Sequence, residues 1–265
     1  MTIAQVDLSV IRKPAPTPTT LNQFSALLER NIRTIIIQWA WTYSVIAPLI
    51  FTAGYYLPLS WIMSGINYGQ FVMPIIVLQT ASFTMISVAQ QAAIEASSGL
   101  TERLHTMPLS RIAPLMANLV SGLLKSALSI GAAIVYGYFV GFRFHGGVLG
   151  TLGFIGIALG TAFVLSLGAD ALGNYSRSVA VVGQTMTLPV LIFGMLSTGF
   201  VPEGGFPAWI RPFVRVQPVS QLSAALRELA SAHPTFSAMW PGLAWLVGMF
   251  VAFLPLAIWA RGRKS

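Results

Sequence analysis

Six stretches of the chain are apolar over about twenty residues each, and shorter polar segments separate them. A helix of about 20 apolar residues crosses the roughly 30 Å hydrocarbon core of a bilayer. Tryptophan and tyrosine gather near the ends of the stretches, as in the aromatic belts of membrane proteins. The pattern predicts an all-α, polytopic membrane protein with six transmembrane helices, near residues 35–57, 71–93, 117–140, 148–170, 179–200 and 242–260.

Composition agrees with a membrane protein, because 55% of the 265 residues are hydrophobic and only 8% are charged. A soluble domain usually carries about a quarter charged residues. The 15 Lys and Arg lie in small groups between the apolar stretches, which favours the positive-inside rule over nucleic-acid binding. Ten of them fall on the N-terminal side of the membrane and four on the other, so we expect a cytoplasmic (inner) membrane protein with both termini cytoplasmic. Lys125 is assigned to the cytoplasmic end of the third span, where it can snorkel.

The two ends of the chain are polar. Residues 1–20 are rich in proline and threonine and predict a disordered cytoplasmic tail, and residues 261–265 form a short basic tail. Residues 21–34 have helical periodicity, with Leu21, Phe24 and Leu28 on one face. This helix either lies in the membrane interface or extends the first span into the cytosol.

The loop between the second and third spans, residues 95–111, carries a short amphipathic pattern. Leu100, Leu104 and Met107 share one helical face, and Pro108 ends the helix. Periodicity alone leaves two uses open, which are docking into the groove of a partner protein and resting at the membrane surface without a partner.

The long outside loop before the last span is too hydrophobic to lie freely in water. Within it, Leu222, Ala225, Leu226 and Leu229 form an apolar stripe opposite Arg227. Residues 201–230 therefore predict short re-entrant or interfacial helices, because irregular backbone at membrane depth must be covered by protein or line a cavity. Structural capping and lining an exit for substrate both remain open.

The order of these features resembles the ABC type-2 permease family, the membrane subunits of ATP-driven exporters. The resemblance covers most of the chain from Leu21 to Arg263 and is greatest to daunorubicin-type drug and mycobacterial-type lipid export permeases. One segment that carries it includes Glu95, Gly99, Leu100, Arg103, Leu104, Met107, Pro108, Leu109, Ser110 and Arg111. The other comprises residues 197–202, then 207–210, then Gln217, Pro218, Val219 and Arg227.

The resemblance implies a cytoplasmic coupling helix that contacts an ATPase and re-entrant helices before the last span. The ATPase-coupling residues would be Glu95, Gly99, Leu100, Arg103, Leu104, Met107, Pro108 and Arg111. The substrate exit would include Phe200, Pro202, Pro207, Trp209, Pro218 and Arg227. The implied partners are two copies of an ATP-binding subunit, a second permease subunit in a homo- or heterodimer, membrane lipid and a hydrophobic substrate.

The chain is not expected to be an enzyme by itself. It has no G-x-x-x-x-G-K-[ST] phosphate loop, so ATP and Mg²⁺ belong on the partner ATPase, and no cofactor is expected on this chain. A membrane-embedded enzyme is disfavoured because His105, His145 and His233 lie in three different loops. With no cysteine and three scattered histidines, a metal site is not expected.

Two other functions stay open. An ion-coupled secondary transporter needs an ionisable group inside the membrane, and Asp170 and Glu95 are the acids near a span. We expect Asp170 to be a snorkelling carboxylate at the end of its helix. A channel or assembly subunit without ATP coupling is the other alternative. Gly156 and Gly160 form a G-x-x-x-G pattern, which we assign to packing within the chain.

Overall fold

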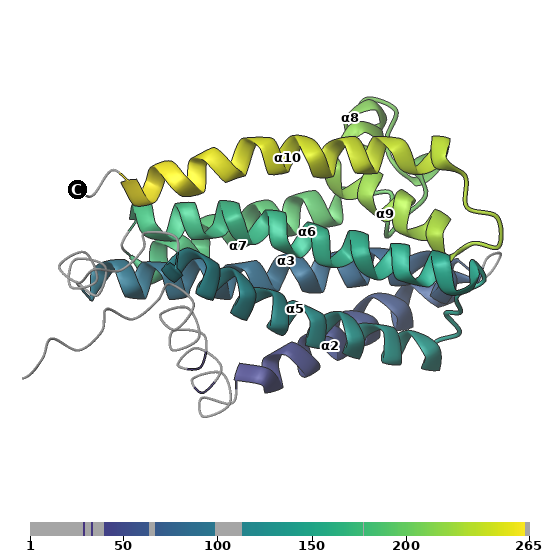
Figure 1. Ribbon diagram of the computed structural model, residues 1–265. Coiled ribbons are helices and arrows are strands. Elements are labelled where there is room, and N and C mark those ends of the chain that lie inside the picture. Colours follow the sequence, from purple (N-terminus) through teal and green to yellow (C-terminus); the bar gives the residue numbers. More distant parts are fainter. Residues whose placement is uncertain are drawn as a thin grey trace, which may run out of the picture.

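The computed structural model describes residues 29, 33, 40–63, 67–98, 113–176 and 178–262. The long helices lie side by side in one bundle (Figure 1). They are α2 (Ala40–Ile62), α3 (Tyr68–Ser97), α5 (Ala113–Phe139), α6 (Gly147–Ser176), α7 (Val179–Met195) and α10 (Phe236–Gly262). Three short helices lie between α7 and α10, namely η2 (Glu203–Gly205), α8 (Arg211–Val216) and α9 (Pro218–Ala230). The described residues contain helices and no strand, which confirms the all-α prediction.

Five of the described helices are long and apolar enough to cross a bilayer, namely α2, α3, α5, α6 and α10. The fifth predicted span, residues 179–200, corresponds to α7, which has 17 residues and a length of about 26 Å. It ends early because the chain turns at Leu196 and carries Gly199 against Ile75 of α3, where a Cβ atom would clash. The six apolar stretches are therefore helical, and α7 falls short of a full span.

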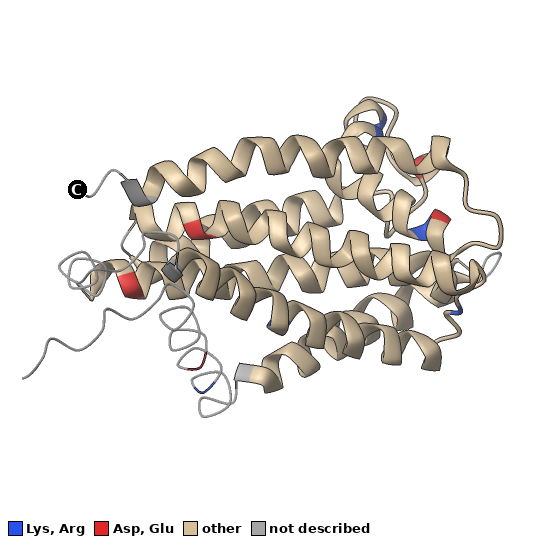
Figure 2. Ribbon diagram, in the orientation of Figure 1, with Lys and Arg blue, Asp and Glu red and all other residues tan. Residues whose placement is uncertain are grey.

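Two helices continue beyond the predicted span ends. α3 continues past residue 93 to Ser97, and α6 continues past residue 170 to Ser176. Glu95 and Asp170 are both buried within these helices, so the charge does not mark where the helix leaves the bundle. The exposed apolar side chains lie on the outer faces of the bundle, while most charged residues lie near its two ends (Figure 2).

Three predicted segments fall largely outside the described residues. They are the tail 1–20, the segment 99–111 and residues 263–265. Of the predicted helix 21–34, only Glu29 and Arg33 are described, and they are helical, exposed and form an ion pair of 3.7 Å.

Helix α3 is the centre of the bundle. It packs against α2, α5, α6, α7 and α9, and residues 72–81 are buried without a break. A helix that is apolar on all sides is expected to be surrounded by other helices. A movement of α3 would therefore change its contacts with most of the other helices.

Helix α9 is held inside the bundle against α3, α6 and α10. The apolar stripe that the sequence predicts is buried, from Leu222 to Leu229. Glycines of α6 make room for it, because a Cβ atom on Gly150 or Gly153 would meet Leu229 within 3.0 Å. Gly156 has open space around its Cα atom and Gly160 faces Leu246 of α10, so the close contact with α9 uses other glycines than the predicted pair.

Candidate substrate site

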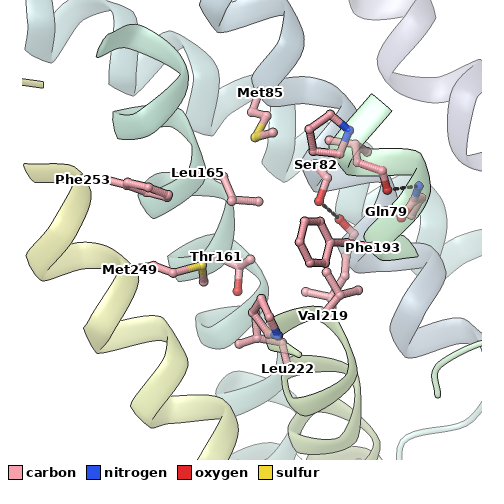
Figure 3. A pocket seen from close by; sticks show the side chains of 14 residues that line it. Gln79, Ser82, Met85, Thr161, Leu165, Phe193, Val219, Leu222, Met249 and Phe253 are labelled. Carbon is pink, nitrogen blue, oxygen red and sulfur yellow. Dashed lines mark hydrogen bonds between the residues drawn. The ribbon is translucent and has the colours of Figure 1, made fainter. Parts of the chain in front are cut away.

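A cavity of about 260 Å³ lies where five helices meet (Figure 3). Helices α3, α6, α7 and α10 supply its walls, and the first turns of α9 close one side. Most of its surface is apolar. The lining residues are Leu78, Gln79, Ser82, Met85, Thr161, Leu165, Pro189, Val190, Phe193, Pro218, Val219, Leu222, Met249 and Phe253.

The polar side chains of this cavity use their donor groups on backbone carbonyls. The Ser82 hydroxyl donates to Leu78 O at 2.9 Å, and the Thr161 hydroxyl donates to Ile157 O at 2.8 Å. Gln79 Nε2 donates across to Val190 O of α7 at 3.4 Å (Figure 3). The Gln79 side chain also lies against Gly194. The cavity thus offers apolar contacts and no charged group, which suits a hydrophobic ligand better than an ion.

A group of hydrogen bonds links the start of α9 to the turn after α7. Gln217 Nε2 donates to Leu196 O and, at 3.1 Å, to the Ser220 hydroxyl oxygen. The backbone N–H of Thr198 also donates to the Ser220 hydroxyl at 3.1 Å. Two segments that the sequence singled out, residues 197–202 and 217–219, are therefore joined directly beside the cavity.

The far end of α9 is fixed to α3 by Arg227. Its Nη2 and Nε donate to Phe71 O at 3.1 and 3.3 Å, and its guanidinium carbon lies 3.9 Å from the centroid of the Phe71 ring. Burial lowers the pKa of Arg227 to about 10, so the side chain remains charged at neutral pH.

The predicted exit residues divide into two groups. Phe200, Pro218 and Arg227 lie around α9, where Pro218 lines the cavity and Phe200 is buried under Tyr55 with ring centroids 4.0 Å apart. The Tyr68 hydroxyl donates to Phe200 O at 3.1 Å. The remaining three precede α8, and the structure does not bring them to the cavity. Pro202 is half-buried, Pro207 is exposed and Trp209 is 80% exposed.

Of the predicted ATPase-coupling residues, Glu95 is the one that the structure describes. The others, Gly99, Leu100, Arg103, Leu104, Met107, Pro108 and Arg111, lie outside the described residues. Glu95 belongs to the last turns of α3 rather than to a loop, and it is buried. Asn118 Nδ2 of α5 donates to its Oε2 at 2.8 Å, and Gln91 Nε2 donates to its Oε1 at 3.4 Å. Glu95 therefore joins α3 to α5 where the segment 99–111 begins.

Two charged residues lie elsewhere than predicted. Asp170 is fully buried in α6 and accepts a hydrogen bond of 3.1 Å from Asn174 Nδ2, so the expectation of a snorkelling carboxylate is wrong. The sequence signal that was missed is the asparagine four residues later, on the same helical face. Lys125 lies near the middle of α5 instead of near its cytoplasmic end, because α5 begins at Ala113.

The family of the chain follows from comparison with known proteins. The model for the ABC-2 family transporter proteins matches residues 60–259, which include every helix that lines the cavity. The chain belongs to the ABC-2 transporter family. It is 37% identical over 227 residues to the doxorubicin resistance ABC transporter permease protein DrrB of Mycobacterium tuberculosis, covering 80% of this chain and 78% of that protein.

Two further relatives extend the comparison. The probable doxorubicin resistance ABC transporter permease protein DrrC of Mycobacterium tuberculosis is 28% identical over 98% of this chain and 97% of its own length. The daunorubicin resistance ABC transporter permease protein DrrB1 of Streptomyces coeruleorubidus is 25% identical over 72% of this chain and 68% of its own length. The resemblance to drug export permeases that the sequence suggested is thus confirmed.

Proposed function

We propose that this ABC-2 chain is the permease subunit of an exporter that moves a hydrophobic or amphipathic substrate toward the outer leaflet. The substrate would be a drug or a complex lipid, and ATP would be hydrolysed on a separate nucleotide-binding subunit. The observation that carries the proposal is the apolar cavity of about 260 Å³ between the spans and α9. The relatives whose names refer to doxorubicin and daunorubicin resistance support a drug-like cargo.

The central position of α3 suggests how the ATPase would act on the cavity. Two ATPase copies, with their Mg²⁺ and ATP, would press on the segment 95–111 and on residues 21–34. α3 leads directly into the first of these segments, and it contributes Leu78, Ser82 and Met85 to the cavity wall. A small rotation of α3 would therefore change the cavity, and a second permease subunit, identical or related, would complete the pathway in the cytoplasmic membrane.

One observation favours a second candidate, an ion-coupled transporter. Glu95 and Asp170 are buried carboxylates on the packed helices α3 and α6, and ionisable groups inside a membrane protein are often part of an ion pathway. Both carboxylates accept hydrogen bonds from asparagine side chains, which equally fits a structural role. Transport that continues without ATP but responds to Asp170→Asn would favour this candidate.

The exporter proposal is tested by filling the cavity. Ser82→Phe places a ring in the cavity, while Ala127→Phe adds the same ring at an exposed position of α5. We would reconstitute each variant with its ATPase partner in proteoliposomes and measure ATP-dependent movement of daunorubicin and of a fluorescent lipid. Ser82→Phe should lower transport to below about a tenth of the parent rate, because the ligand space is occupied.

The control variant should transport like the parent protein. Equal transport by Ser82→Phe and the parent would contradict a role for this cavity. If the purified complex contains no ATPase and moves substrate without ATP, the proposed energy source is wrong.

A further inference from the structure

A second cavity, of about 350 Å³, lies between α2, α3 and α5. It shares no lining residue with the first cavity and lies on another face of α3, because Thr80, Thr84 and Ser87 face it while Leu78, Ser82 and Met85 face the first. Its walls carry hydroxyl groups and one cation, Lys125. Such a polar lining between apolar helices contrasts with the apolar surroundings of the first cavity.

The position of Lys125 along α5 is unusual for a lysine. Twelve residues of α5 precede it, or about 18 Å of helix, and the distance from it to Phe139 is about 21 Å. The lysine side chain has a four-carbon stem and is much shorter than either distance, so its ammonium group does not reach either end of α5. A charged group inside a bundle of membrane-spanning helices is costly and usually marks a functional site.

Several hydroxyl groups line the same cavity as Lys125. Ser129 lies one turn from Lys125 on α5 and is 2% exposed, and Ser44 of α2 is 8% exposed. Thr84 and Ser87 already donate to backbone carbonyls, at 3.0 and 2.8 Å. Their hydroxyl oxygens can accept but have no proton left to donate to a ligand.

Among the donors that remain available are the ammonium of Lys125 and the hydroxyl groups of Ser44 and Ser129. In the part of the chain that the structure describes, none of these three has a hydrogen-bond or ion-pair partner, and no acidic residue lines the cavity. One cation with hydroxyl donors on two helices is suited to an anion such as a phosphate or carboxylate. The same cation would repel a cationic ligand.

The cavity opens at the edge of the bundle. Tyr43, which lines it, is 77% exposed, and α2 presents Ile46 and Ile50 on its outer surface. In a bilayer this opening faces acyl chains, so a molecule with an apolar tail can place its head in the cavity while its tail stays in lipid.

We propose that the cavity around Lys125 binds the anionic group, phosphate or carboxylate, of an amphipathic molecule within the helix bundle. The proposal deepens the exporter function and rests on it for the role in transport, while the binding itself is independent of ATP. The cavity would therefore bind anionic amphipaths in preference to cationic ones.

The test is a binding measurement on the full-length chain in phosphatidylcholine nanodiscs without ATP. The probes are dodecyl phosphate, dodecyltrimethylammonium and inorganic phosphate, and calorimetric titration gives Kd for each. The parent protein should bind dodecyl phosphate at least about tenfold tighter than the ammonium amphipath or inorganic phosphate. Lys125→Met should remove this preference, and Lys125→Arg should keep it.

Two further variants separate binding from folding and from net charge. Ser129→Ala leaves the cation in place and should weaken dodecyl phosphate about tenfold, which is the effect of one hydrogen bond to a charged group. Arg215→Gln removes the same charge from an exposed position and should leave Kd unchanged. If Lys125→Met does not fold, Ser129→Ala decides the question.

Several results would overturn the proposal. One is equal binding of the anionic and cationic amphipaths. Another is an unchanged Kd for dodecyl phosphate in both Lys125→Met and Ser129→Ala. A third is a loss of affinity in Arg215→Gln as large as that in Lys125→Met. Inorganic phosphate binding as tightly as dodecyl phosphate would identify a free-anion site and refute the amphipathic ligand. If the protein keeps its preference for the anionic amphipath but shows no ATP-driven transport, the result would count against the exporter function alone.

Discussion

Arg227 provides a quantitative test of how α9 is held in the bundle. Its guanidinium is half-buried, donates twice to Phe71 O and stacks on the Phe71 ring. Replacing it by lysine keeps the charge, and replacing it by methionine keeps an apolar stem without charge. We expect Arg227→Lys to release α9 more than Arg227→Met does, although lysine is the more conservative change by charge.

The magnitudes that lead to this expectation nearly cancel for arginine. Two N–H groups share one carbonyl, which is worth about 2 kcal/mol, and the buried cation–π contact adds about 1–2 kcal/mol. Against this, burial lowers the pKa of Arg227 to about 10, a desolvation cost of about 3 kcal/mol. Methionine loses both the favourable contacts and the desolvation cost, so Arg227→Met should change the docking free energy of α9 by less than about 1 kcal/mol.

Lysine keeps the desolvation cost of a buried charge and loses much of the favourable contact energy with Phe71. Its ammonium is more strongly hydrated than a guanidinium and cannot stack as a planar group on Phe71. Arg227→Lys should therefore weaken docking by about 2 kcal/mol, which increases the open population of α9 roughly thirtyfold.

The assay uses the absence of cysteine from the chain. Ser223 lies on α9 and is fully buried, and Ser223→Cys only replaces its oxygen by a sulfur atom, so this variant should report opening of α9 by its rate of maleimide labelling. The rate is measured on the protein in nanodiscs, where both membrane faces are accessible. When opening is faster than labelling, the rate follows the open population.

Controls come from Arg215, whose ion pair with Glu203 is exposed. Arg215→Lys and Arg215→Met should each change the labelling rate less than about threefold, because exposed pairs contribute little. Faster labelling in Arg227→Met than in Arg227→Lys would refute the reasoning, since it would mean that the charge itself stabilises docking.

Two further predictions concern packing and coupling. A Cβ atom on Gly173 of α6 would collide with the backbone of Ala89 in α3. Gly173→Leu should therefore destabilise the protein by about 3 kcal/mol and lower its Tm in detergent. Gly156 has open space around it, so Gly156→Leu should leave Tm nearly unchanged. Equal Tm values for these two variants would contradict the close approach of α3 and α6. The double substitution Arg103→Glu and Leu104→Asp should abolish transport-coupled ATPase stimulation while the permease still inserts and folds, and normal transport by it would exclude a docking role for the segment 95–111.

The sequence alone predicts the helices well because lipid demands continuous apolar stretches. All six stretches are helical, and the apolar stripe of α9 is buried as its periodicity indicates. The helix ends were less accurate, since α3 and α6 continue past the predicted span ends, and Glu95 and Asp170 near those ends are each buried beside an asparagine. Local hydropathy does not show which side chain of another helix will hydrogen-bond to a carboxylate, as Asn118 of α5 does to Glu95.

The candidate sites show the same division. The segments 197–202 and 217–219 were singled out in advance, but their junction through Gln217 and Ser220 depends on the path of α9. Gln79 and Thr161 were not predicted, although a glutamine inside an apolar span is a visible signal. The position of Lys125 within its helix was misjudged because it depends on where α5 begins, and hydropathy locates helix ends only to within a few residues.

The way in which α9 packs against α3 and α6 has a consequence for biogenesis. Both of those helices leave the ribosome well before α9 does, so the glycine-lined surface of α6 that receives Leu229 stays uncovered while α7 and α8 are made. At about 5–20 residues per second this interval lasts several seconds. The nascent protein thus passes through a stage with an open groove in the membrane, in which lipid or an insertion factor must occupy the place of α9.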